Sequence, residues 1–295
     1  MSHDHSHNHH DSTGNIKTAF FLNLVFTLIE IVGGLFTNSL AILSDALHDL
    51  GDTFSLGLSW YLDRVSKKKH DNVYSYGYKR FSLLAAVINS IVLVVGSIYI
   101  LTEALPRLMN PEHSNAQGMF VLALVGIGIN GLAVLRLRSG KSMNERVVTW
   151  HLLEDVLGWV AVLIVSIVMY FWDLHILDPL LSLGITLYVL WNVVKNLRKT
   201  VKIFLQSVPD SVDTESLEQS ITALSKVQAV HDTHIWSLDG EYNVLTTHVA
   251  VNKDTSQEEV YDLKCEIKKI AHEGNIEHVT IEVEYEGEDC TTSQH

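Results

Sequence analysis

The sequence predicts a helical membrane bundle followed by a small cytosolic α+β domain. The chain has 295 residues, of which 47% are hydrophobic, and its apolar residues are concentrated in long runs. Each run can cross the hydrocarbon core of a bilayer, about 30 Å thick, as a helix that rises about 1.5 Å per residue. Basic residues fall in alternate loops, and the last part of the chain has a different, acidic composition.

Six apolar runs predict six transmembrane helices, at approximately residues 18–36, 40–62, 81–103, 118–136, 147–172 and 177–197. The first run lacks a basic leader and is followed closely by the second, so it is not a cleaved secretory signal. Asp178 and Pro179 predict an N-cap and a first-turn proline for the sixth helix. We expect residues 1–17 to be a His-rich flexible cytosolic leader and residues 18–208 to form the transmembrane domain.

The distribution of Lys and Arg predicts the orientation of the bundle. The loops after the second, fourth and sixth spans hold fourteen of these residues, whereas the three other loops hold Arg107 alone. Because cytoplasmic loops are enriched in Lys and Arg, both termini are expected in the cytosol. The protein is therefore predicted to be an integral protein of the cell membrane, surrounded by the lipid bilayer.

Residues 209–295 are predicted to form a separate cytosolic module, with five basic and nineteen acidic residues. Their pattern reads helix, strand, strand, helix, strand, and an Asp239-Gly240 pair between the first two strands indicates a hairpin. An acidic module attracts cations, and we expect no nucleic-acid partner. Cys265 and Cys290 provide no disulfide framework, as is typical of a cytosolic domain.

Four ionisable residues of the stretch SDALHDLGD fall on one face of the second predicted helix. Successive helical residues turn by about 100°, which places Asp45, His48, Asp49 and Asp52 within an arc of about 100°. The fifth helix repeats the pattern, because His151 and Asp155 lie four residues apart. Two His and two Asp side chains, His48, Asp52, His151 and Asp155, make a complete tetrahedral shell for Zn²⁺.

The alternative for these residues is a buried ion-pair network between helices. No Lys or Arg lies deep in a predicted span to pair with the acids, and carboxylates facing one another repel, so a bound dication is the better interpretation. Metal binds the neutral imidazole and protonation expels it, which makes one site able to exchange Zn²⁺ for H⁺. Asp45 and Asp49 are candidates for relaying protons or orienting a ligand imidazole.

The chain resembles the cation diffusion facilitator family, zinc-transporting type. The matching stretches are NSLAILSDALHDLGD, YSYGYKRFSLLAAVINS, HLLED, DPLLSLGITLYVLW, HDTHIWSL and HVTIEVE. The resemblance implies a six-helix bundle, a homodimer, a ferredoxin-like or metallochaperone-like tail, and proton-driven export of zinc from the cytosol. It also implies that the transport ligands are His48, Asp52, His151 and Asp155, and that regulatory zinc binds His231, His248 and Glu284 in the tail, with Cys290 as a candidate fourth ligand.

Several functional alternatives stay open at this point. The main substrate could be Cd²⁺, Co²⁺ or Fe²⁺ instead of Zn²⁺, since imidazole and carboxylate ligands accept more than one metal. A membrane-anchored metal sensor would leave the polar stripe unexplained, and an intramembrane metalloenzyme would need an open metal position and a general base. We therefore expect a transporter and no enzyme. The histidines of the leader, His3, His5, His7, His9 and His10, are expected to raise the local metal concentration.

Overall fold

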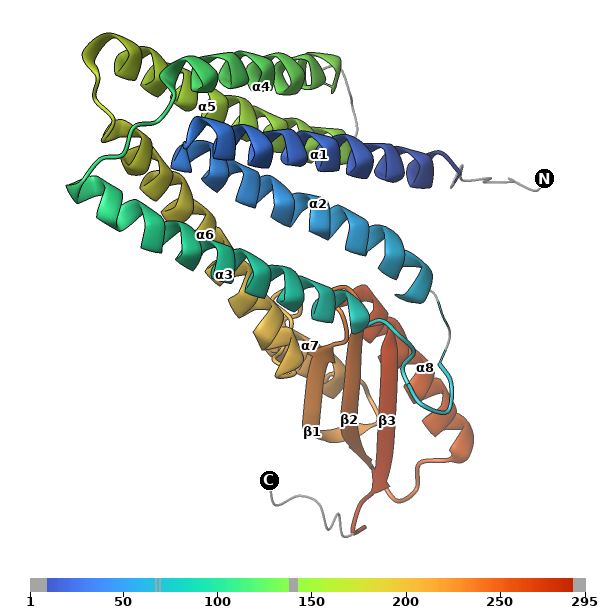
Figure 1. The fold of residues 1–295 in the computed structure, drawn as a ribbon. Helices are drawn as coiled ribbons and strands as arrows, with labels where there is room; N and C mark the ends of the chain where they lie inside the picture. The colour runs from blue at the N-terminus through green and yellow to red at the C-terminus, as the bar shows by residue number, and fades with distance from the viewer. Residues whose placement is uncertain (1–9, 67, 69, 138–142, 289–295) are drawn as a thin grey trace. The chain divides into compact units, whose positions relative to one another are not determined.

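The structure is a computed structural model that describes residues 10–66, 68, 70–137 and 143–288. The chain forms two compact units, one made of Met1–Arg64 and Ala85–Leu197 and the other of Val65–Leu84 and Arg198–His295. Six long helices lie mostly in the first unit (Figure 1): α1 His10–Thr37, α2 Leu40–Ser66, α3 Phe81–Met109, α4 Ala116–Leu137, α5 Met143–Trp172 and α6 Leu177–Phe204.

The six predicted helices are confirmed, with longer bounds for most of them. α1 begins at His10, before the start predicted for the first span. Within the described residues, four helices are long and apolar enough to cross a membrane, namely α3, α4, α5 and α6. The apolar stretch of α1 is shorter, Asn23–Thr37. α2 is one continuous helix, but acidic residues interrupt its apolar sequence.

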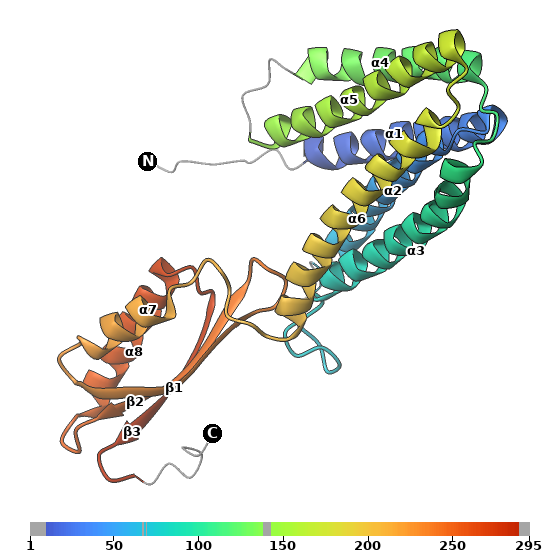
Figure 2. The same cartoon turned by 90° about the vertical axis from the view of Figure 1, so that its left-hand side faces the viewer.

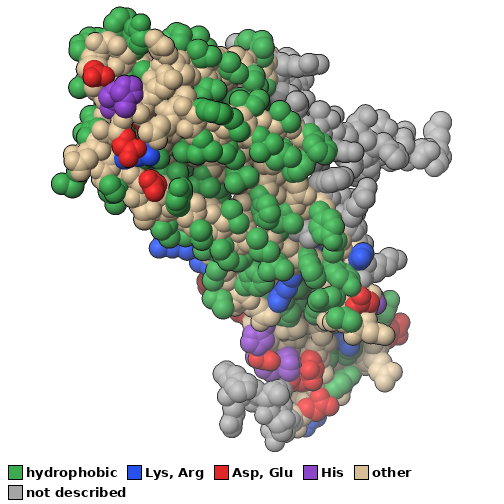
Figure 3. Space-filling view, in the orientation of Figure 1, with side chains coloured by type: hydrophobic (Ala, Val, Ile, Leu, Met, Phe, Trp, Pro, Cys, Tyr) green, Lys and Arg blue, Asp and Glu red, His purple; other side chains and the backbone are tan. Residues whose placement is uncertain are grey.

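The helical unit has an apolar outside and a partly polar inside. Large hydrophobic side chains such as Leu132, Phe171 and Trp191 are mostly exposed, and hydrophobic side chains cover much of the face shown in Figure 3. Polar side chains are buried between the helices, including Thr27, Glu30, Ser44, Asp45, Asp49, Thr53, Ser97, Asn130 and Ser166. This distribution fits a bundle surrounded by lipid, because a lipid-facing surface must be apolar whereas polar groups find partners between helices.

Small residues allow the helices of the bundle to approach closely. Leu47 of α2 packs over Gly96 of α3, and Leu93 of α3 packs over Gly51 of α2. Each helix thus places a leucine against a glycine of the other. On α4, a Cβ atom added at Gly126 would overlap the ring of Trp159 on α5, which is buried. The position of α2, which carries the polar stripe, is therefore set by close packing.

Asp178 caps a helix other than its own, which corrects the expectation from the sequence. It lies in the first turn of α6, which begins at Leu177. Its carboxylate accepts hydrogen bonds from the hydroxyl of Ser39 (2.5 Å) and from the backbone amides of Leu40 (2.9 Å) and Ala41 (3.2 Å). These amides are the free donors at the start of α2, so the cap joins the beginnings of α2 and α6.

The second unit contains the predicted order of helix, strand, strand, helix, strand. The elements are α7 Thr214–Thr222, β1 Val227–Ser237, β2 Asn243–Val251, α8 Gln257–Glu273 and β3 His278–Tyr285. The sheet order is β1-β2-β3, with β1 and β2 antiparallel and β2 and β3 parallel. The predicted hairpin is confirmed: Gly240 has φ +101°, and the carboxylate of Asp239 accepts from the amides of Glu241 and Tyr242.

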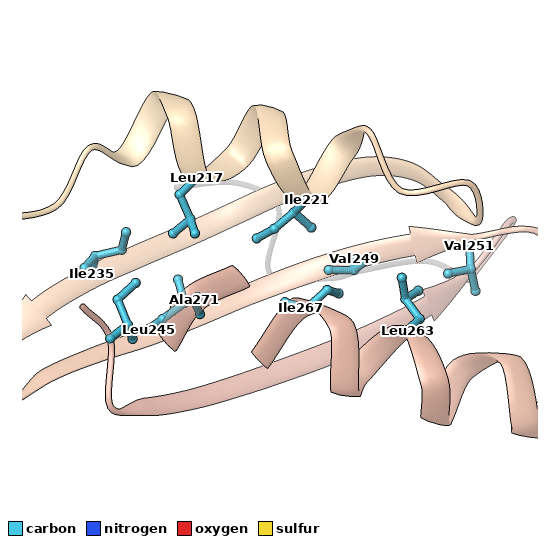
Figure 4. Packing of buried hydrophobic residues seen from close by; sticks show 10 residues of the cluster. Leu217, Ile221, Ile235, Leu245, Val249, Val251, Leu263, Ile267 and Ala271 are labelled. Carbon is cyan, nitrogen blue, oxygen red and sulfur yellow. The ribbon is translucent and has the colours of Figure 1, made fainter. Parts of the chain in front are cut away.

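The two helices of this unit cover one face of its sheet (Figure 2). Figure 4 shows the core between them, in which Leu217 and Ile221 of α7 and Leu263 and Ile267 of α8 meet Leu245 and Val249 of β2. Because side chains alternate along a strand, His248 lies on the opposite face from Leu245 and Val249. Polar side chains on that face lie outside the apolar core and can form a site.

Residues of the α2–α3 connection belong to the same unit as the sheet. The ammonium group of Lys79 lies 3.8 Å from a carboxylate oxygen of Asp239 and 4.3 Å from the centre of the Tyr242 ring. Asp71 organises the connection, because it accepts from the amide of Tyr74 and from the hydroxyl of Tyr78. These hydrogen bonds lower the pKa of Asp71 below its ordinary value, the amide of Tyr74 contributing most.

Candidate metal centres

The polar stripe of α2 lies inside the helical unit. Asp45 and Asp49 are buried, and His48 and Asp52, one helical turn apart, are half-buried with their Nε2 and Oδ2 atoms 3.7 Å apart. The face is polar because every third or fourth residue carries a polar group. Since Asp45 and Asp49 are buried, the stripe points towards the other helices of the bundle.

A cavity of about 560 Å³ connects the stripe with α5. Asp45 and His48 of α2 and Asp155 and Glu154 of α5 line it, together with apolar residues of α6. A Cβ atom at Gly158 would lie 3.4 Å from Oδ1 of Asp45, so α5 comes within van der Waals distance of the buried carboxylate. Of the four predicted transport ligands, His48 and Asp155 line this cavity and Asp52 lies beside His48.

The fourth predicted ligand, His151, belongs to α5 one turn before Asp155. Its side chain lies outside the described part of the structure, so its position relative to the cavity is still a prediction. Backbone geometry places residues four apart on one face of a helix. The four-residue spacing therefore predicts that His151 shares a face of α5 with Asp155.

Glu30 of α1 adds a further carboxylate to this centre. Its side chain is 1% exposed, and the carboxylates of Asp49, Asp45 and Asp155 are close enough to act on it electrostatically. The carboxylate of Asp49 likewise lies close enough to those of Asp45, Asp155 and Asp52 for electrostatic repulsion. Several carboxylates in one low-dielectric interior repel one another, and this repulsion is relieved by a cation or by protons.

A second candidate centre lies on the face of the sheet away from α7 and α8. Its ligand atoms come from His231 of β1, His248 of β2 and Glu284 of β3 and all lie within 4.8 Å of one another. Nδ1 of His248 is 2.5 Å from Oε1 of Glu284, and Nε2 of His231 is 3.2 Å from its Oε2. His231 and His248 are directly paired in the antiparallel register, which brings the two rings together.

Two further carboxylates lie close to His248, and no local pattern in the sequence points to the one from Asp232. Oδ2 of Asp232 and Oε2 of Glu282 lie 3.5 and 3.6 Å from Nε2 of His248. Asp232 has φ +50° and falls where the register of β1 shifts between His231 and His234. His234 turns to Asp232, with 3.0 Å between Nε2 and Oδ1. The last predicted ligand, Cys290, lies outside the described residues.

The described residues thus form a membrane-type helical bundle with a cavity that Asp45, His48 and Asp155 help to line, and a small α+β unit with a His and Glu cluster. Two family models match the chain: the cation efflux transmembrane domain over residues 16–205 and the cation efflux protein cytoplasmic domain over residues 209–286. The chain belongs to the cation diffusion facilitator family of metal-cation efflux proteins.

Relatives of the chain include several transporters. It is 33% identical over 292 residues to the cadmium, cobalt and zinc/H⁺-K⁺ antiporter of Bacillus subtilis, covering 96% of this chain and 92% of that protein. It is 35% identical to the metal cation efflux system protein CzcD of Cupriavidus metallidurans, covering 96% and 90%. With the zinc transporter ZitB of Escherichia coli the identity is 32%, covering 98% and 96%.

Proposed function

We propose that this chain exports Zn²⁺ from the cytosol in exchange for H⁺. The substrate ion would be held by His48 and Asp52 of α2 and by His151 and Asp155 of α5. One observation carries the proposal: His48 and Asp155, from two different helices, line one cavity formed by α2, α5 and α6. A tetrahedral shell of two imidazoles and two carboxylates suits Zn²⁺.

The exchange follows from the chemistry of the ligands. Zn²⁺ binds to neutral imidazole and to carboxylate, so its arrival displaces protons from the site, and protons arriving from the other side displace the metal. In this proposal Asp45, Asp49 and Glu30 hold protons near the ligands. They suit this role because their side chains are buried and their carboxylates act on one another.

The surroundings of the site complete the proposal. Residues 18–208 would be the transport domain of a cell-membrane protein with both termini in the cytosol, as the distribution of Lys and Arg indicates. Residues 209–295 would be a regulatory domain of a homodimer, in which Zn²⁺ binds His231, His248 and Glu284. A metal that prefers one arrangement of two domains stabilises that arrangement.

The second candidate function is export of Cd²⁺ or Co²⁺, or exchange for K⁺ in place of H⁺. The name of the Bacillus subtilis relative includes cadmium, cobalt and K⁺ beside zinc and H⁺. Cd²⁺ and Co²⁺ accept the same imidazole and carboxylate ligands, so the site alone does not exclude them. Substrate and counter-ion must therefore be measured separately.

The test is ion flux in vesicles that contain the purified full-length chain. When the vesicle interior is acidic, we expect Zn²⁺ uptake together with a rise in internal pH, because H⁺ leaves as Zn²⁺ enters. Without a pH gradient, uptake should be much slower. A K⁺ gradient at constant pH, and Cd²⁺ or Co²⁺ in place of Zn²⁺, separate the alternatives. Vesicles that remain inert to all three metals under both gradients would overturn the transporter proposal.

A further inference from the structure

Three potential metal ligands meet at the end of the helical unit where the α3–α4 and α5–α6 connections lie. They are His113 of the first connection and Asp173 and His175 of the second, and their ligand atoms all lie within 4.8 Å of one another. Figure 3 shows histidine and carboxylate side chains exposed close together at this end. None of the three belongs to the transport centre or to the centre on the sheet.

The geometry of the three side chains approaches that of a metal shell. Nε2 of His175 lies 2.9 Å from Oδ1 of Asp173, and the rings of His113 and His175 have their centres 4.2 Å apart. Two ligands of a tetrahedral Zn²⁺ ion, each about 2.0–2.1 Å from the metal, are separated by about 3.3 Å. Small side-chain rotations would therefore bring all three ligand atoms around one ion.

The backbone on both sides of the cluster is held in place. Ser114, next to His113, donates its hydroxyl to the carbonyl of Asn38 (3.1 Å) and to Oδ2 of Asp178 (3.3 Å). The side-chain amide of Asn38 donates to the carbonyl of His113 (3.3 Å). Asp178, which caps α2, thus connects the α3–α4 connection with the α5–α6 connection that carries His175. A site built on such joined segments needs little ordering when an ion binds.

His175 is the least exposed of the three side chains. Its side chain is 14% exposed, and its Nδ1 atom is buried without a hydrogen-bond partner among the described residues. Metal binding through Nε2 of His175 would replace its contact with Oδ1 of Asp173, because both atoms would then coordinate the ion.

We propose that His113, Asp173 and His175 bind a divalent cation of the Zn²⁺ class. Two imidazoles and one carboxylate supply three ligands, and water completes the shell because His113 and Asp173 are exposed. The ion joins the α3–α4 and α5–α6 connections. The site goes beyond the proposed transport centre and does not depend on it, since it shares no ligand with that centre.

The experiment measures protection of individual histidines in the full-length chain in detergent, with Zn²⁺ alone as the probe. Diethyl pyrocarbonate modifies free imidazole nitrogen, and peptide mass spectrometry reads each histidine separately. We expect Zn²⁺ to protect His113 and His175 along one saturation curve, because a metal-bound nitrogen cannot react. His272, exposed on α8 and outside both clusters, is the internal reference and should not be protected.

Two substitutions make the test specific. Asp173→Asn keeps the shape of the side chain and suits the left-handed backbone at φ +53°, and it should weaken the protection of His113 by roughly tenfold or more. Glu112→Gln removes an exposed charge next to His113 that pairs with Arg107 and lies outside the cluster, and it should leave protection unchanged.

The proposal would be overturned if Zn²⁺ failed to protect His113 in the original chain. It would equally be overturned if Asp173→Asn left the protection intact, or if Glu112→Gln weakened it as much as Asp173→Asn does. Because each histidine is read separately, a loss of Zn²⁺ transport would not produce any of these results.

Discussion

The carboxylate of Asp178 on α6 accepts a 2.5 Å hydrogen bond from the hydroxyl of Ser39, the residue that precedes α2. The two residues are far apart in the sequence, yet together they fix the start of the helix that carries Asp45, His48 and Asp49. Asp178 is completely buried, and Ser114 donates to it as well. One acidic side chain therefore holds three segments of the bundle at the same end.

Replacing Asp178 with Ala should destabilise the helical unit. The substitution leaves the hydroxyl of Ser39 and the amides of Leu40 and Ala41 without their acceptor, and unsatisfied buried donors cost about 1–3 kcal/mol each. Denaturant unfolding in detergent, followed by circular dichroism, should show a loss of at least about 2 kcal/mol. Asp254→Ala is the control: it removes an exposed acidic side chain of the second unit and should change the stability little. Equal stability of both variants would contradict the role given to this cap.

Gly126 and Gly128, two residues apart on α4, should respond differently to the same substitution. A Cβ atom at Gly126 overlaps the buried ring of Trp159, whereas one at Gly128 has no atom within 4 Å among the described residues. Overpacking a dense interior costs about 1–3 kcal/mol, so Gly126→Ala should lower the melting temperature in detergent. Gly128→Ala should leave it unchanged or raise it, because Ala favours helix over Gly. Identical shifts for the two variants would refute the packing described for α4 and α5.

His248→Ala combined with Glu284→Ala should weaken zinc binding by the cytosolic unit by roughly tenfold or more. The reason is that Glu284 faces both histidines of the cluster, at 2.5 and 3.2 Å. Calorimetric titration of the full-length chain carrying His48→Ala measures this with less contribution from the transport centre. In flux assays on the chain with His48 retained, the double variant should keep transporting while its dependence on zinc concentration becomes flatter.

His234→Ala provides the control for this prediction. It removes a histidine of β1, the strand that carries His231; this histidine pairs with Asp232 and lies outside the ligand group. Its zinc affinity should match that of the unsubstituted chain. An unchanged affinity in the double variant would discard the proposed ligands, and complete loss of flux would mean that the cytosolic unit is part of the transport path.

Periodicity predicted the long helices and the order of the cytosolic elements, because burial of apolar faces leaves a regular pattern in the sequence. The polar stripe of α2 was visible for the same reason. The cap by Asp178 was predicted for the wrong helix, since a local rule assigns an acidic residue before a proline to the helix that follows it. In the structure, the carboxylate of Asp178 accepts hydrogen bonds from the first amides of α2. No local sequence pattern predicts this contact, because the two helices are far apart in the sequence.

Residues in irregular backbone were the least predictable. Asp232 reaches His248 only because the register of β1 shifts beside it and its φ is positive, and neither feature follows from alternation. His113 and His175 meet across two connections that have no periodicity. Glu30 was predictable as an acid in a span, whereas its closeness to Asp49 and Asp155 depends on how α1, α2 and α5 pack.

The most direct test of the central proposal is simultaneous measurement of Zn²⁺ and H⁺ flux in vesicles containing His48→Ala, Asp155→Ala or the control Glu103→Gln. Each ligand variant should lose nearly all Zn²⁺ flux and the coupled H⁺ movement, while remaining folded and eluting like the unsubstituted protein. Glu103→Gln, which removes a carboxylate of α3 that does not line the cavity, should transport normally. Near-normal coupled flux in His48→Ala and Asp155→Ala would contradict the assignment of the transport site.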